Sequence, residues 1–151
     1  MAVVNLIGRV FMEPLDSPFQ TIERLLPELQ ARARVIVVDM HAEATSEKAA
    51  MAYFVAGKVA AVLGSHTHVQ TADERIIAGG TAFITDAGMC GPVESVIGVR
   101  PELAVRRFVT QMPTKFEVAS GPVVVQGVIV DIDAASGRAQ AIGRLREIVS
   151  P

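Results

Sequence analysis

The stretch VIVVDMHAEATSEKAAMAYFVAGKVAAVLGSHTH, residues 35–68, decides the fold. Its two ends, 35–39 and 59–64, are short apolar runs typical of strands in a parallel sheet that is covered on both faces. Residues 45–57 between them carry the signals of a helix, namely a cap, a first-turn acid and a glycine stop, supplied by Thr45 or Ser46, Glu47 and Gly57. This order predicts a strand–helix–strand crossover with both strands parallel in one sheet.

The residues before this stretch repeat the pattern. Residues 2–10 are apolar and β-branched and predict another buried strand. A helix follows, because Ser17 can cap it and Pro18 suits its first position, while Pro27 is expected to kink or divide it. Two successive crossovers therefore favour a parallel sheet, whose ligands gather beyond the carboxyl ends of the strands.

Beyond residue 68 the pattern changes to shorter strands. We expect two strands joined at 79–80, a functional or subunit-contact loop at 89–99 and a helix at 101–111. An antiparallel meander should follow, with strands at 114–120, 121–133 and 138–148. The sequence thus predicts an α/β fold, with parallel strand–helix–strand units followed by an antiparallel meander, in a single domain over residues 1–151.

Composition excludes several classes of protein. Half of the residues are hydrophobic and 20% are charged, which excludes intrinsic disorder. The net charge is −2 and no basic run is present, so we expect no stable DNA binding. No apolar run reaches the roughly 18 residues of a membrane span, and the single Cys90 cannot form an internal disulfide. A cytoplasmic protein without membrane contact is the resulting expectation.

The three histidines of the chain, His41, His66 and His68, all follow predicted strand ends. On an extended stretch His66 and His68 would point to the same side, with Thr67 turned away. His41 lies 25 residues before His66, a spacing that one crossover returns to the same sheet edge. A lone histidine is usually an ordinary polar loop residue, but three at neighbouring strand ends favour a metal site.

Several polar residues adjoin these histidines. Asp39 and Glu43 could each bind a metal or accept an imidazole N–H. Alternatively, Asp39 is a hydrogen bonder at the end of its strand, and Glu43 is a solvated loop residue. The favoured role of Thr45 is to cap the helix. A helix N-terminus beside a metal site is also a favourable place for a phosphate group. Thr67 is a further candidate for an outer contact or a substrate contact. For Asp86 a turn role is favoured over an outer contact to the site.

Four stretches carry a resemblance to a known family: NLIGRVFMEPLDSPF, VVDMHAEATSEKAAM, GSHTHVQTADERI and ITDAGMCGPVESVIG. They resemble the carboxyl-terminal part of the YmdB-like family, a branch of the calcineurin-like metallophosphoesterases. The resemblance implies a layered αββα sandwich of the metallophosphoesterase type around two divalent metal ions. Iron or manganese is expected, with zinc or magnesium as alternatives. The implied activity is phosphodiesterase action on cyclic nucleotides, including 2′,3′-cyclic forms.

The same resemblance implies roles for the histidines. His41 and His66 would bind one metal, and His68 the other. The family's amino-terminal aspartate, bridging glutamate, asparagine ligands and general-acid histidine have no match in this chain. We therefore expect an incomplete site whose missing half comes from a partner chain or a homo-oligomer.

Two alternatives stay open. The chain could be a catalytically inactive metal-binding or oligomerisation module. It could also be an independent mononuclear hydrolase, because three nitrogen ligands suffice for one catalytic metal with an open position.

Overall fold

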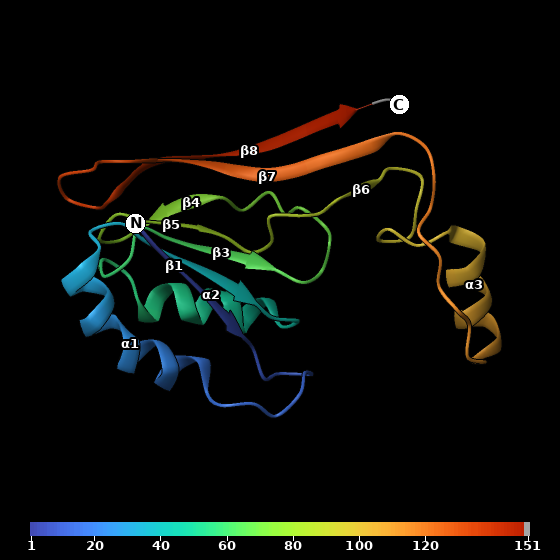
Figure 1. Ribbon diagram of the computed structural model, residues 1–151, viewed down its shortest axis with the longest axis horizontal. Helices are drawn as coiled ribbons and strands as arrows, with labels where there is room; N and C mark the ends of the chain where they lie inside the picture. The colour runs from blue at the N-terminus through green and yellow to red at the C-terminus, as the bar shows by residue number, and fades with distance from the viewer. Residues whose placement is uncertain (150–151) are drawn as a thin grey trace.

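A computed structural model describes residues 1–149 and shows a central five-stranded sheet (Figure 1). In chain order its strands are β1 (Ala2–Ile7), β2 (Ile36–His41), β3 (Ala61–Ser65), β4 (Arg75–Ile77) and β5 (Thr81–Ile84). In space the order is β1-β2-β3-β5-β4. All neighbours are parallel except β4, which is antiparallel to β5 at one edge. The predicted crossovers and the predicted pair of short strands are confirmed.

Two helices cover one face of this sheet: α1 (Pro18–Arg32) and α2 (Thr45–Phe54) (Figure 1). The side chain of Ser17 accepts a hydrogen bond from the backbone N–H of Gln20 and caps α1, and Pro18 is the first helical residue, as predicted. Pro27 lies inside a single helix of 15 residues and does not divide it.

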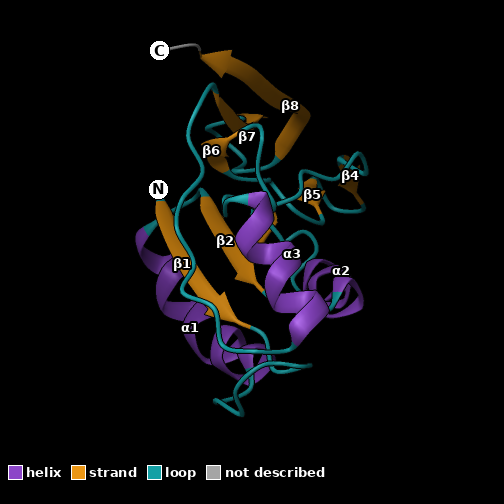
Figure 2. Cartoon of the chain, turned by 90° about the vertical axis from the view of Figure 1, so that its right-hand side faces the viewer, coloured by secondary structure: helices purple, strands orange, loops and turns teal. Residues whose placement is uncertain are grey.

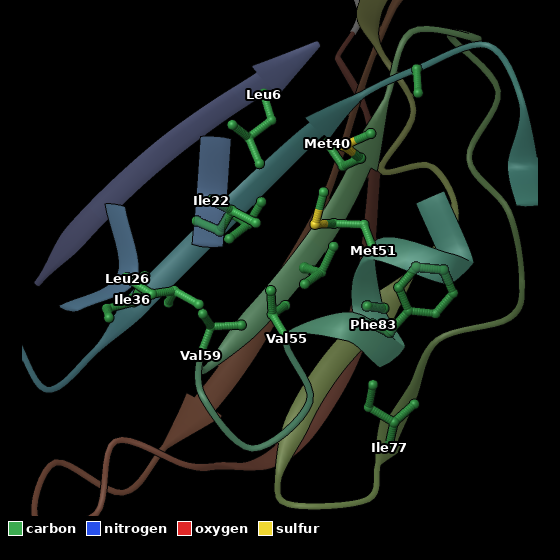
Figure 3. Packing of buried hydrophobic residues seen from close by; sticks show 14 residues of the cluster. Leu6, Ile22, Leu26, Ile36, Met40, Met51, Val55, Val59, Ile77 and Phe83 are labelled. Carbon is green, nitrogen blue, oxygen red and sulfur yellow. The ribbon is translucent and has the colours of Figure 1, made fainter. Parts of the chain in front are cut away.

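The main core lies between this sheet face and the two helices (Figure 3). It is aliphatic and thioether-rich, and each large side chain buried there contributes about 1.5–3 kcal/mol relative to exposure. This layer holds the strand ends in fixed positions relative to one another. Its largest buried members include Ile22, Ile36, Met40, Met51 and Phe83.

The start of α2 differs from the prediction. Its cap position is Ala44, which makes no side-chain cap hydrogen bond, and Thr45 is already the first helical residue. The prediction that Thr45 or Ser46 caps the helix is therefore wrong. The helix ends at Phe54, three residues before Gly57.

Glu47, in the first turn of α2, shapes the chain after β1. Its buried carboxylate accepts hydrogen bonds from the backbone N–H groups of Arg9 (3.0 Å) and Val10 (3.2 Å). Gly8 still donates its backbone N–H to the carbonyl of His41 (2.9 Å), but Arg9 and Val10 bond to Glu47 instead of to β2, and β1 ends at Ile7 rather than at residue 10.

A second, antiparallel sheet lies on the opposite side of the first sheet from α1 and α2 (Figures 1 and 2). It contains β6 (Cys90–Pro92), β7 (Val123–Ile132) and β8 (Ala139–Val149) in that order. β8 packs on β4 and β5, and a small apolar cluster around Ala61, Ala82 and Ala139 joins the two sheets. The described residues thus form a helix layer and two sheet layers.

Residues 93–122, which we call the arm, connect the two parts of the second sheet and contain α3 (Pro101–Thr110). Figure 1 shows α3 apart from both sheets. The strand predicted at 114–120 is wrong, because only the single bridge between Val99 and Val118 forms there. The alternating apolar residues serve the arm itself, where Phe116 and Phe108 of α3 line the same small apolar cavity. The third strand of the sheet is instead β6, inside the predicted loop.

Among the described residues, no helix combines the length and apolar character that a membrane crossing requires. The longest of them, α1, has 15 residues, whereas about 20 are needed.

Candidate functional site

The carboxyl ends of β2 and β3 lie side by side, as the crossover pattern predicts. In the parallel register, His41 at the end of β2 is opposite Ser65 at the end of β3. His66 follows Ser65 directly, so its imidazole reaches His41 from the neighbouring strand. The sheet edge thus brings together two histidines that are 25 residues apart in the chain.

The two imidazoles are in direct contact. His66 Nδ1 lies 3.0 Å from His41 Nε2, and the rings are nearly perpendicular with centroids 4.8 Å apart. A hydrogen bond between two imidazole nitrogens needs one proton, which one nitrogen donates and the other accepts. A cation in place of that proton would find two nitrogen donors, which is the donor chemistry that Zn, Fe and Mn sites use.

A chain of hydrogen bonds orients His41. Asn5 donates to Asp39 Oδ2 (2.7 Å), and the hydroxyl of Ser65 donates to Asp39 Oδ1 (2.6 Å). Because this uses the hydroxyl proton, Ser65 Oγ can only accept from His41 Nδ1, 3.1 Å away. The arrangement places the proton of His41 on Nδ1 and the lone pair on Nε2. Asp39 therefore acts on His41 through Ser65, a residue that sequence reasoning missed together with Asn5.

Glu43 takes the outer position on His66. Its carboxylate Oε2 lies 3.0 Å from His66 Nε2, and its side chain is half exposed. Of the three roles open to Glu43, this contact favours an acceptor for an imidazole N–H over a solvated loop residue, and direct binding of a metal stays a prediction.

His68 lies further along the same loop and has its own partner. Its Nδ1 lies 3.0 Å from the backbone carbonyl of Ile97 in the arm, which requires a proton on Nδ1 and leaves the lone pair on Nε2. The extended geometry expected for this pair is wrong: His66 has φ 112° and His68 has φ 65°. The two side chains consequently leave the loop in different directions, one to His41 and one to the arm.

All three histidines nevertheless line one cavity of about 520 Å³. Within residues 1–149, no group of three or more His, Cys, Asp or Glu side chains is already arranged as a metal site. The donor set therefore fits a metal ion in part: two nitrogens are together, and His68 lies on the same cavity without joining them.

A buried ion pair supports the loop between the histidines. Lys48 Nζ lies 2.9 Å from Asp86 Oδ2, and both side chains are fully buried. The same oxygen accepts the backbone N–H of Thr67 (3.0 Å), and Asp86 Oδ1 accepts that of Gly88 (2.9 Å). Burial raises the pKa of Asp86, but the bonds from Lys48, Gly88 and Thr67 outweigh it and hold the pKa below its usual range.

The Lys48–Asp86 ion pair is packed closely against Gly64 of β3. A Cβ on Gly64 would overlap the carbonyl oxygen of Thr85 and the stem of Lys48. Lys48 shares a helical face with three apolar residues, and this spacing was the signal that it is buried: Met51, Ala52 and Val55.

The two threonines have different positions. The backbone of Thr67 is held by Asp86, and its Oγ1 accepts the N–H of Val69 (3.3 Å). Thr45 is exposed at the start of α2, and within residues 1–149 no hydrogen bond joins it to a histidine. The structure thus brings Thr67, but not Thr45, into the histidine loop.

Sequence comparison identifies relatives over nearly the whole chain. Residues 1–145 match the family described as YmdB-like protein. A Bacillus subtilis (strain 168) protein named 2′,3′-cyclic-nucleotide 2′-phosphodiesterase is 47% identical over 145 residues, which cover 96% of this chain and 55% of the relative. A Mycoplasma pneumoniae protein named putative phosphatase/phosphodiesterase is 40% identical over 134 residues, which cover 87% of this chain and 47% of the relative.

Structural comparison agrees. A crystal structure of a hypothetical protein from Thermus thermophilus superposes with a TM-score of 0.92 and 40% identity, over 99% of this chain and 57% of that one. A novel phosphatase from Mycoplasma pneumoniae superposes with a TM-score of 0.88 and 36% identity, over 97% of this chain and 52% of that one. The predicted α/β class is confirmed, and the chain spans about half the length of these relatives. On this evidence the chain belongs to the YmdB-like family, whose members include proteins named as phosphodiesterases and phosphatases.

Proposed function

We propose that this chain forms part of a metal-dependent phosphodiesterase that hydrolyses cyclic nucleotides, including 2′,3′-cyclic forms. The observation that carries the proposal is that His41 and His66 are in contact at the carboxyl ends of β2 and β3, and that His68 lines the same cavity. The 47% identity with the Bacillus subtilis phosphodiesterase supports the choice of reaction. The small phosphodiester substrate would bind in this cavity.

In this proposal His41 and His66 bind one divalent ion and His68 binds a second. Iron or manganese is expected, with zinc or magnesium as alternatives. The hydrogen bonds support the assignment, since His41 and His68 each hold a proton on Nδ1 against an oxygen and keep the Nε2 lone pair. The ions would supply Lewis acidity toward the phosphoryl oxygens.

The chain's own residues position these donors. Asp39 and Ser65 fix the tautomer of His41, and Glu43 holds the outer nitrogen of His66. The amide of Thr67, held by Asp86, fixes the backbone between the two loop histidines. A general acid for the leaving oxygen is not assigned to any residue of this chain.

We further propose that a second polypeptide segment, from a partner chain or from another copy, completes the site. β1 is an edge strand of the parallel sheet, and Val3, Asn5 and Ile7 on one of its faces are exposed. Such an edge offers unpaired backbone groups to another strand. The length of the relatives, about twice the matched region, supports a segment of this kind.

Hydrolysis of 2′,3′-cyclic AMP in the presence of Mn²⁺ tests the proposal. The purified chain should turn over poorly, and adding the part of the Bacillus subtilis relative that this chain does not cover should raise the rate. His41→Ala should abolish the gain, while Val105→Ala, on α3 outside the cavity, should preserve it. Full activity of the chain alone would overturn the requirement for a partner segment. Failure of every combination would overturn the proposed reaction.

A second candidate is an inactive metal-binding or oligomerisation module. It is favoured by exposed apolar side chains on the arm, among which Phe108 and Val109 are 71% and 77% exposed. Sedimentation with and without Mn²⁺ separates the candidates: metal-dependent self-association without any phosphodiesterase activity in the complementation assay would favour the module.

A further inference from the structure

The cavity beside the histidines has a second wall of different chemistry. The three histidines and Ser65 contribute the polar part of its lining, and the loop at 88–92 together with residues from both ends of the arm contributes the rest. The side chains that line this second wall are apolar or sulfur-containing. They belong to Met89, Cys90, Pro92, Ile97, Val99 and Val118, and we call them the apolar wall.

Backbone strain is concentrated around the same cavity. Of the five non-glycine residues with positive φ in residues 1–149, His66, His68 and Ile97 line it. Ile97, with φ 48°, is the most unusual, because a β-branched side chain is strongly disfavoured in that region. Strain of this kind persists where the surrounding structure enforces it, and it gathers at binding sites.

The strain at Ile97 links the two walls. Its carbonyl oxygen accepts the hydrogen bond of His68, while its side chain, 51% exposed, lies on the apolar wall. One residue thus places a candidate metal ligand and an apolar surface at a fixed separation. A loop without a binding role has no need for this strained conformation, so the strain at Ile97 points to a binding site.

The two walls together match a ligand with a charged end and a flat uncharged end. At about 520 Å³, the cavity falls in the range of small-molecule sites, which combine apolar surface with a few polar groups. We propose that the apolar wall binds the nucleobase of the substrate while its phosphate lies at the histidines. This assignment rests on the proposed phosphodiesterase function and adds the part of the site that holds the organic group.

The wall has a distinct chemistry for such a role. Among the described residues, no aromatic or charged side chain belongs to this wall, so the base would lie against thioether and aliphatic groups rather than stack on a ring. Met89 can adapt its side chain to the base, whereas Ile97 and Pro92 are stiff. Binding should therefore depend on apolar contact area.

Ligand titration of the purified chain in the presence of Mg²⁺ tests the proposal, with 3′-AMP, adenosine and inorganic phosphate as probes. Methyl NMR signals of Met89 and Ile97 should shift with 3′-AMP and with adenosine, and not with phosphate. 3′-AMP should bind at least about tenfold more tightly than phosphate. Ile97→Gly removes the side chain and relieves the backbone, so this variant should fold and lose most of that advantage. Met89→Ala should act in the same direction.

A matched control is Val105→Ala, which truncates an exposed aliphatic side chain of α3 outside the cavity and should leave the 3′-AMP advantage unchanged. If adenosine leaves Met89 and Ile97 unshifted, or Ile97→Gly keeps the full advantage, the apolar wall does not bind the base. If adenosine binds there but phosphate and 3′-AMP show no contact with the histidines, the wall stands and the phosphodiesterase proposal fails.

Discussion

The cavity is bordered by two regions built on different principles. The histidine edge, which comprises residues 39–43 and 64–68 with Lys48 and Asp86, lies on a sheet layer with a dense aliphatic core and a fully buried ion pair. The arm, residues 93–122, has a single buried residue in its helix, Ala104, and exposes most of its large apolar side chains. His41 and His66 therefore rest on a densely packed layer, whereas His68 bonds to Ile97 of the arm, whose helix buries one residue only.

The sharpest test of this contrast is Asp86→Ala. It would leave Lys48 as an uncompensated buried charge, which costs about 3–5 kcal/mol in the free energy of unfolding. Chemical denaturation measures it. The matched control is Glu117→Ala, which removes an exposed partner of Arg100 in the arm and should change stability little. Equal losses in the two variants would contradict the contrast.

Replacing Gly64 by alanine should also destabilise the histidine edge. The new methyl group would overlap the Thr85 carbonyl and the stem of Lys48, and overpacking of this kind costs about 1–3 kcal/mol or more. Gly143→Ala in β8 is the control, because within residues 1–149 no atom other than those of its chain neighbours lies within 4 Å of the added Cβ there. Thermal unfolding of the two variants should differ clearly, and similar midpoints would show that β3 can move away from Thr85.

Acid should weaken the sheet region that adjoins the histidine edge. Burial raises the pKa of Asp73, but hydrogen bonds from Thr71, Thr85 and Arg75 lower it more, to about 2 from 3.8. Because the folded chain binds this proton less tightly than the unfolded chain, the stabilisation is present above about pH 4 and is lost as the pH falls toward 2.

Urea midpoints between pH 6 and pH 2 measure this dependence. The loss of stability between pH 6 and pH 2 should be smaller than the loss caused by Asp86→Ala. In Asp73→Asn, the plot of urea midpoint against pH should be flatter below pH 4 and keep its form above pH 5. An Asp73→Asn curve that stays as steep as that of the parent chain would assign the acid sensitivity to other carboxylates.

The smallest effect is expected in the arm. Val109→Ser changes a side chain of α3 that is 77% exposed, so it should alter the free energy of unfolding by less than about 0.5 kcal/mol. A loss above about 2 kcal/mol in dilute solution would mean that this face of α3 is covered, and the arm would no longer differ from the histidine edge.

The position of the histidine edge was predictable from the sequence, because it follows from local patterns, whereas the positive φ angles that turn His66 and His68 apart were not. Apolar runs before Met40 and before Ser65 predict parallel strands, and parallel strands bring their carboxyl ends to one edge. What could not be predicted was the role of Ser65 between Asp39 and His41, since it depends on the register between β2 and β3.

The arm was predictable only in part. A proline at the first position identified α3 correctly, yet the alternation around Phe116 and Val118 predicted a strand that is absent from the second sheet. Alternation reports that one side of a segment is apolar, and it does not report whether a sheet or a helix receives that side. The left-handed conformation of Ile97 had no sequence signal, because isoleucine rarely adopts it.

The position of Cys90 gives this chain a practical property. It is the single cysteine of the sequence, it is exposed, and it belongs to the apolar wall that lines the cavity together with the histidines. A thiol-reactive fluorophore would therefore label one known place without any engineering of the sequence. A change in its fluorescence would then show when a metal ion, a nucleotide or a completing segment binds at the cavity. Adding them one at a time would show the order in which they bind.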